Sequence, residues 1–118
     1  MLKPTRRALK KKADKLWAEI VKSVGRCLKC GSRDKQLQAA HIISRRFTNT
    51  RHDIRNGLCL CAACHRWAHD YPTAFGRFAE SLRGRETIEQ LEKQSKFLTK
   101  PDYEAVIAEL MALKSSMI

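Results

Sequence analysis

Residues 56–65 read NGLCLCAACH, and this stretch decides the fold because its two cysteines, Cys61 and Cys64, repeat an earlier pair. The earlier pair, Cys27 and Cys30, has the same two-residue spacing. Four thiolates in two short turns suit tetrahedral Zn²⁺, since each turn folds back on one ion with Zn–S bonds of about 2.3 Å. The sequence therefore predicts a four-cysteine structural zinc site that replaces part of a hydrophobic core.

The composition describes a folded chain of modest size. Its 118 residues suggest one domain, and 43% of them are hydrophobic but only 7% aromatic, so that a metal would help a small core. Five cysteines, with no apolar leader after Met1, indicate a reducing compartment in which thiols bind metal. No stretch reaches the ~20 apolar residues that span a bilayer. We therefore expect a cytoplasmic protein that does not enter a membrane.

The formal net charge of +12 is unevenly distributed. Residues 1–66 hold 17 Lys and Arg against 4 Asp and Glu, whereas residues 67–118 hold 7 against 8. The whole cationic excess therefore lies in the half that contains the cysteines. A field confined to one half attracts a polyanion and releases its counterions. A nucleic acid is the expected partner, and a basic face that is only solvated is the alternative.

Residues 1–25 are expected to contain a basic amphipathic helix over residues 4–24. Pro4 suits a first helical turn, and Gly25 suits the end. Apolar side chains recur at helical spacing on one face: Leu9, Leu16, Trp17, Ile20, Val21 and Val24. The opposite face is cationic, and either contacts phosphate or is only solvated. Its candidate phosphate contacts are Arg6, Arg7, Lys10, Lys11 and Lys12.

Residues 26–70 are expected to form the compact unit around the zinc. Residues 37–43 and 57–60 are short and apolar, which predicts two strands. The loop between them, residues 44–56, is basic. Its candidate phosphate contacts are Arg45, Arg46, Arg51 and Arg55.

A helix is expected to start near Cys61 and to run through His69. On such a helix His65 and His69 are four residues apart and project from one face. Cys59 lies in a strand-like run, so we expect a buried, unreactive thiol. His52, beside an arginine in the loop, is expected to be a phosphate contact or a plain surface residue.

Residues 71–118 are nearly neutral and are expected to be helical. Their apolar stripes suggest core-forming helices rather than a cofactor site. The first stripe is Phe75, Phe78, Ala79 and Leu82. The second is Ile88 and Leu91, with Thr87 as a possible N-cap. The third follows a helix start at residues 99–102 and consists of Val106, Ile107, Leu110, Met111 and Leu113.

Residues 56–65 resemble the second half of the HNH endonuclease motif, in which an Asn is followed by an apolar strand and then by Leu-Cys-x-x-Cys-His. Residues 40–43, AHII, resemble the first half, and the separation of His41 from Asn56 is typical of the family. The resemblance covers residues 27–69 and is closest to small phage- and prophage-type members with a four-cysteine zinc site. It implies an α+β fold with a ββα-metal core, flanked by N- and C-terminal helices, in a single nuclease domain over residues 1–118.

The resemblance also implies a role for each motif residue. His41 corresponds to the general base that activates water, and Asn56 to the central Asn that ties the loop together. His65 corresponds to a ligand of the catalytic divalent cation (Mg²⁺, Mn²⁺, Ni²⁺ or Zn²⁺), and His69 to the second histidine of members with His-x-x-x-His. The implied activity is metal-dependent cleavage or nicking of DNA that leaves 5′-phosphate and 3′-hydroxyl ends.

One position departs from the family pattern. Ala40 stands where the family usually carries Asp or His as a further metal ligand, and only Asp53 or Asp70 offers a substitute carboxylate. The chief alternative function is therefore a zinc-stabilised DNA-binding module that has lost cleavage. A zinc protein–protein adaptor is disfavoured by the basic half. Three questions remain open: whether His65 is a spare zinc ligand, whether His69 is only a surface imidazole, and whether the protein is a monomer or a homodimer.

Overall fold

The computed structural model describes residues 2–117, which form a mixed α+β fold. In chain order its elements are α1 (Arg6–Lys22), β1 (Leu37–His41), a 3₁₀ turn (Ile54–Asn56), β2 (Gly57–Cys61), α2 (Ala62–Asp70), α3 (Pro72–Arg83), α4 (Arg85–Ser95) and α5 (Tyr103–Ser116). The fold class predicted from the sequence is thus confirmed. Both predicted strands and the helix that follows them form a ββα unit.

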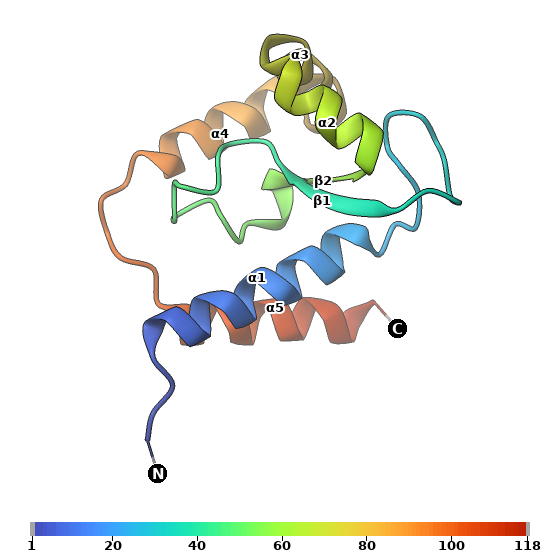
Figure 1. Cartoon of the computed structure of the whole chain (residues 1–118). Coiled ribbons are helices and arrows are strands. Elements are labelled where there is room, and N and C mark those ends of the chain that lie inside the picture. Colours follow the sequence, from blue (N-terminus) through green and yellow to red (C-terminus); the bar gives the residue numbers. More distant parts are fainter. Residues whose placement is uncertain (1, 118) are drawn as a thin grey trace.

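The two strands form an antiparallel sheet that lies between two layers of helices (Figure 1). Leu37 is opposite Cys61, and His41 is opposite Gly57. Side chains alternate between the two faces of a strand, so the strands supply both layers. One face packs against α2 and α3, and the other packs against α1, which lies beside α5.

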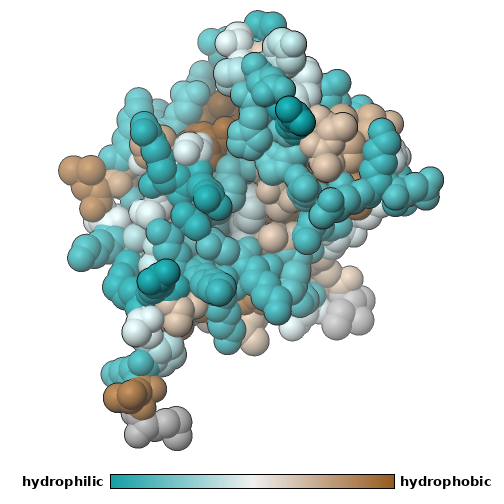
Figure 2. Space-filling model, viewed as in Figure 1, coloured by the Kyte–Doolittle hydropathy of each residue, from teal (hydrophilic) through white to brown (hydrophobic). Residues whose placement is uncertain are grey.

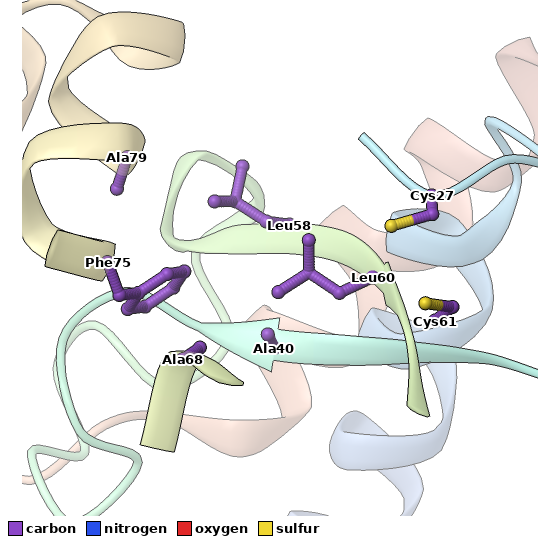
Figure 3. Packing of buried hydrophobic residues seen from close by; sticks show 8 residues of the cluster. All are labelled: Cys27, Ala40, Leu58, Leu60, Cys61, Ala68, Phe75 and Ala79. Atoms are coloured by element: carbon purple, nitrogen blue, oxygen red, sulfur yellow. The ribbon is translucent and has the colours of Figure 1, made fainter. Parts of the chain in front are cut away.

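The first core cluster fills the space between the sheet and α3. Leu58 and Leu60 of β2 are fully buried there, together with Phe75 and Ala79 of α3. Figure 3 shows the Phe75 ring beside Ala68 and Ala40, with the sulfur atoms of Cys27 and Cys61 at the far end of the cluster. The cysteine cluster and the apolar core are therefore continuous.

The second core cluster lies between the sheet and α1, and it includes Cys59. α1 starts at Arg6, because Thr5 is the N-cap and its hydroxyl accepts a hydrogen bond from the Ala8 amide at 3.1 Å. Pro4 therefore precedes the helix, in contrast to the prediction. The buried face of α1 consists of Ala13, Trp17, Ile20 and Val21. Val24, expected on that face, lies past the end of the helix and is exposed.

Among the C-terminal helices α5 starts where predicted, whereas α4 starts earlier and part of the predicted core is exposed. α4 begins after Gly84, which has a φ of +86°, so Thr87 lies inside the helix and is not its N-cap. Asp102 caps α5 by accepting a hydrogen bond from the Ala105 amide at 3.2 Å. Three side chains expected in the core are exposed, because α3 and α5 bury narrower stripes than the sequence suggests: Leu82, Met111 and Leu113.

The surface seen in Figure 2 is mostly hydrophilic, and its apolar groups are scattered. None of the helices within residues 2–117 combines the length and the apolar composition needed to cross a membrane.

Gly57 is the point at which α1 approaches the sheet most closely. Its φ of −122° is open to any residue, so the requirement for glycine is one of space. A Cβ atom at this position would lie 2.5 Å from Cγ2 of Val21 and 2.7 Å from Cζ2 of Trp17. Both atoms belong to buried side chains of α1, which would have to move.

We expect Gly57→Ala to lower the free energy of unfolding by about 1–3 kcal/mol, as overpacking of a core does. Gly76→Ala is the matched control, because a Cβ there meets nothing within 4 Å and glycine inside a helix is itself unfavourable. The control should stabilise by about 0.5–1 kcal/mol. Urea denaturation of the three proteins measures both effects, and equal stability of Gly57→Ala and wild type would contradict the close approach of α1.

Candidate active site and metal cluster

The four predicted cysteines lie together at one end of the sheet. Their Sγ atoms are all within 4.8 Å of one another, and the Sγ atoms of Cys30 and Cys61 are 3.8 Å apart. Cys27 and Cys30 lie in the turn after α1, Cys61 ends β2, and Cys64 lies in the first turn of α2. This is the one group of three or more potential metal ligands found within residues 2–117. The cluster could hold a structural metal ion.

Backbone amides support these sulfurs. The amide of Cys30 donates to Sγ of Cys27, and the amide of Cys64 donates to Sγ of Cys61, both at 3.5 Å. Burial raises the pKa of Cys27, but backbone N–H groups outweigh it and lower that pKa to about 6. Burial and the neighbouring thiols raise the pKa of Cys64 to about 12. Four sulfurs this close cannot all ionise without a cation to neutralise them.

Cys59, the fifth cysteine, lies outside the cluster. It is buried against α1, as expected, and burial raises the pKa of its thiol. Neighbouring residues of a strand point to opposite faces, which separates Cys59 from the face of Leu58 and Leu60.

The two histidines of α2 converge on one point. Their Nε2 atoms are 3.3 Å apart. His65 is half-buried, and its Nδ1 donates to Oε1 of Gln38 on β1 at 2.8 Å. This hydrogen bond places the proton of a neutral His65 on Nδ1 and leaves its Nε2 as an acceptor, here for Nε2 of His69. His69 is exposed and lies one turn further along the helix.

His41, the last residue of β1, is held on two sides. Its Nε2 donates to the backbone carbonyl of Arg51 at 3.0 Å, so that Nδ1 of the neutral ring carries a lone pair. The ring stacks on the indole of Trp17, with centroids 4.0 Å apart and planes 13° from parallel. Burial lowers the pKa of His41 to about 4, against an ordinary value near 6.5. The ring is therefore neutral at pH 7.

Asn56 ties the loop to the sheet and is fully buried. Its Oδ1 accepts from the Ile43 amide at 2.7 Å, and its Nδ2 donates to the carbonyls of Ile43 and Thr50, both at 3.1 Å. All of these partners lie in residues 43–50. The carboxamide therefore fixes the segment that follows His41.

One hollow brings the histidines together. It has a volume of about 620 Å³ and is lined by His41 from β1 and by His65 and His69 from α2. Ala40 lines the same hollow, although it is 1% exposed and packs in the first core cluster. Arg45 lies at its rim and also lines a second hollow, which reaches Lys22 of α1. We call the first of these the histidine hollow.

The cations predicted to contact phosphate fall into two groups. We call those that are bound to another group of the protein by a hydrogen bond or an ion pair engaged, and the other exposed ones free. Arg45 is exposed, and Arg46, also exposed, lies over the ring of Phe47. Arg51 is bound to Asp14 through two hydrogen bonds of 2.8 Å, and Arg55 is paired with Asp53 at 2.8 Å.

The basic face of α1 contains one further engaged cation. Arg6 donates to the carbonyl of Pro101 at 3.1 Å and lies over the ring of Tyr103. Arg7, Lys11 and Lys12 are exposed, and Lys10 is half-buried.

Two further expectations are corrected. His52 is not a surface residue: it is 7% exposed, with its Nε2 2.7 Å from a carboxylate oxygen of Asp14. Asp53 is paired with Arg55 and caps the 3₁₀ turn, and Asp70 is an exposed residue 4.0 Å from Arg66. Neither carboxylate lines the histidine hollow.

Sequence analysis missed three residues that surround the histidines. The position of Gln38 was predictable from the sequence, because it is two residues before Ala40 and therefore lies on the same face of β1. The positions of Trp17 and Asp14 were not, since both lie on α1 and their partners are 24 and 37 positions away in the chain.

The ββα unit, the cysteine cluster and the histidine hollow all lie within one segment of the chain, residues 27–76. Residues 27–76 match the family model described as HNH endonuclease. The resemblance to HNH endonucleases that the sequence motif indicates is therefore confirmed over this segment. No curated protein and no solved structure matches the chain.

We expect removal of the metal to unfold residues 26–70, because ligand binding at such a site is coupled to folding. Cys27→Ala should lower the melting temperature sharply and abolish metal retention. Cys59→Ala is the matched control, since both thiols are buried and only Cys27 belongs to the cluster. Calorimetry and metal analysis test this, and equal losses for the two variants would mean that the cluster carries no structural metal.

Proposed function

We propose that the whole chain, residues 1–118, acts as a single metal-dependent endonuclease domain that cleaves or nicks DNA and leaves 5′-phosphate and 3′-hydroxyl ends. One observation carries this proposal. His41, with its Nδ1 lone pair free, lines the same hollow as His65 and His69, whose Nε2 atoms converge. A hydrolytic phosphodiesterase needs a base beside a site for a cation, and these three side chains supply both.

His41 is the general base in this proposal. The hydrogen bond to the Arg51 carbonyl keeps the proton on Nε2, so that Nδ1 accepts the proton of a water that enters the hollow. The low pKa ensures that the ring is unprotonated at neutral pH. A phosphodiester anion bound nearby favours the imidazolium, and so raises the proton affinity of His41 when substrate is present.

His65 and His69 hold the divalent cation. Two nitrogens bound to one ion at about 2.1 Å and at near-tetrahedral angles lie roughly 3.4 Å apart, close to the 3.3 Å between the Nε2 atoms. Gln38 fixes the tautomer of His65 that a ligand requires. When bound, Mg²⁺, Mn²⁺, Ni²⁺ or Zn²⁺ would supply Lewis-acid stabilisation of the phosphate and of the leaving oxygen.

Zn²⁺ is the ion we propose for the cysteine cluster. Two sulfurs bound tetrahedrally at about 2.3 Å lie roughly 3.8 Å apart, as Cys30 and Cys61 do. His65 is not a spare ligand for this ion, because its Nδ1 is bonded to Gln38 and its Nε2 faces His69.

The alternative function is a zinc-stabilised DNA-binding module without cleavage. Ala40 favours it, since its methyl group lines the histidine hollow where a metal-binding side chain stands in the family. Two protein ligands leave most coordination positions to water and substrate. The proposed enzyme therefore needs a high concentration of metal, and a plasmid-nicking assay across the four metals separates it from the module.

We expect His41→Ala to reduce nicking by ~10²–10⁴-fold, the usual contribution of an acid–base group. Affinity for DNA and zinc content should not change, because the imidazole contributes to neither. The measurement is single-turnover nicking of supercoiled plasmid in Mn²⁺ or Mg²⁺. Nicking by His41→Ala at the wild-type rate would show that the base is misassigned.

Ala40→Asp should lower the Mg²⁺ or Mn²⁺ concentration needed for half-maximal nicking, because a carboxylate adds a hard oxygen donor beside the His65–His69 pair. Ala40→Asn is the matched control, with the same shape and a weaker donor. Metal titrations of the nicking rate compare the two variants. If Ala40→Asp and Ala40→Asn need the same metal concentration for half-maximal nicking, Ala40 does not occupy the position of a missing metal ligand.

The free and engaged arginines should differ in the salt dependence of DNA binding. Arg45→Gln should reduce the slope of log K against log salt by about 0.9, the value for one phosphate contact. Arg55→Gln should leave the slope unchanged, because Asp53 already neutralises Arg55. Fluorescence anisotropy across salt concentrations measures both slopes, and equal slopes would remove Arg45 from the DNA contacts.

A further inference from the structure

The surroundings of His41 come largely from a helix outside the segment that matches the HNH family. That segment is residues 27–76, whereas α1 is Arg6–Lys22. Asp14 and Trp17 are three residues apart on α1 and therefore share one face. Both line the second hollow, which meets the histidine hollow at His41.

Trp17 restrains the plane of the imidazole. Its indole stacks on the His41 ring and is itself fixed, because its Nε1 donates to the Asp53 carbonyl at 2.9 Å. Trp17 is also 2% exposed. A stacked and immobile wall of this kind prevents the ring of His41 from tilting toward α1.

Asp14 restrains the hydrogen-bond partner of the imidazole. Its two carboxylate oxygens bind Nε and Nη2 of Arg51 at 2.8 Å each, a bidentate pair of fixed geometry. One oxygen also lies 2.7 Å from Nε2 of His52. Two consecutive residues of the loop are thus held on one carboxylate. The carbonyl of the first of them, Arg51, accepts the hydrogen bond that Nε2 of His41 donates.

We propose that Asp14 and Trp17 are positioning residues for His41: Trp17 fixes the plane of its ring, and Asp14 fixes the carbonyl that selects its tautomer. This inference rests on the proposed role of His41 as the base. It adds two residues from α1 to the active site. The carboxylate acts through Arg51 and touches neither substrate nor metal.

A role of Asp14 in the electrostatics of DNA binding alone would have the opposite effect on activity. The carboxylate lies in the basic half of the chain, where a negative charge repels DNA. Its removal would then tighten DNA binding and raise the rate at low DNA concentration. A positioning role requires the rate at saturating DNA to fall, because misplacement of a catalytic group by about 1 Å can cost up to ~10²-fold.

The first measurement is the tautomer of His41 and does not depend on activity. Nitrogen-15 NMR of the imidazole distinguishes a proton on Nε2 from one on Nδ1. Wild type should hold the Nε2–H form alone, and Asp14→Asn, which loses the charge and one acceptor oxygen, should hold a mixture. Glu19→Gln is the matched control: it removes the same charge from α1, but Glu19 pairs with Lys114 at the surface and touches neither Arg51 nor His41.

The second measurement is nicking kinetics on the same variants. Asp14→Asn should lower kcat roughly 10- to 100-fold with KM for DNA unchanged or lower, whereas Glu19→Gln should keep the wild-type kcat. Trp17→Phe retains a ring that can stack on His41, so it should lower kcat less than Trp17→Leu does. The two variants are compared under conditions of equal thermal stability.

Arg51→Lys breaks the same link from the loop side without a change of charge, since lysine cannot make the bidentate pair. It provides the test if Asp14→Asn does not fold, and it should give the same tautomer mixture. A single Nε2–H tautomer in both variants, with kcat equal to that of Glu19→Gln, would overturn the inference. If wild type nicks no DNA with any metal, the proposed function fails, and the tautomers still decide whether Asp14 positions His41.

Discussion

The structure depends first on the convergence of the cysteine sulfurs at Cys61. This residue ends β2, caps α2 by accepting a hydrogen bond from the Cys64 amide, and contributes its sulfur to the cluster. Because one side chain has all three functions, a metal bound there would fix the direction in which α2 leaves the sheet. That direction places His65 beside Gln38 and brings both α2 histidines over β1. The cluster takes no part in the proposed chemistry, yet Cys64 directly precedes His65, so the cluster sets the geometry on which the chemistry relies.

The second constraint is the missing side chain at Gly57. His41 is opposite Gly57 in the sheet, and the absence of a Cβ lets Trp17 and Val21 of α1 come close to β2. Trp17 thereby reaches the neighbouring strand and stacks on His41. The alternation of β1 completes the division: Gln38 and Ala40 face α2, where the cation is proposed to bind, while His41 faces α1. The base is therefore supported from the α1 side of β1 and the ligands from the α2 side, and both line the histidine hollow.

Much of this arrangement was predictable, because short-range patterns determine it. The Cys-x-x-Cys spacing, the apolar strands and the four-residue spacing of His65 and His69 are local signals, and the cluster, the sheet and α2 follow them. Helix boundaries were predicted less well. The hydroxyl of Thr5 caps α1 although Pro4 also suits a first turn, and Gly84 ends α3 through its positive φ. The exposure of Leu82 and Leu113 depends on how far the sheet and α1 extend. No local pattern encodes that extent.

The contacts that shape the proposed active site are long-range, and local sequence patterns do not predict them. Asp14 lies in a helix whose charged residues are mostly cations, and nothing in its neighbourhood identifies Arg51 and His52 as its partners. The same long-range contact explains why a count of positive charges overstates the surface available to DNA. Asp14 and Asp53 each neutralise an arginine of the loop, so of the loop arginines only Arg45 brings an unpaired charge to the lining of the histidine hollow. The loop arginines thus divide into a pair that can meet phosphate and a pair that holds the loop. Arg51 of the second pair gives His41 its fixed hydrogen-bond partner.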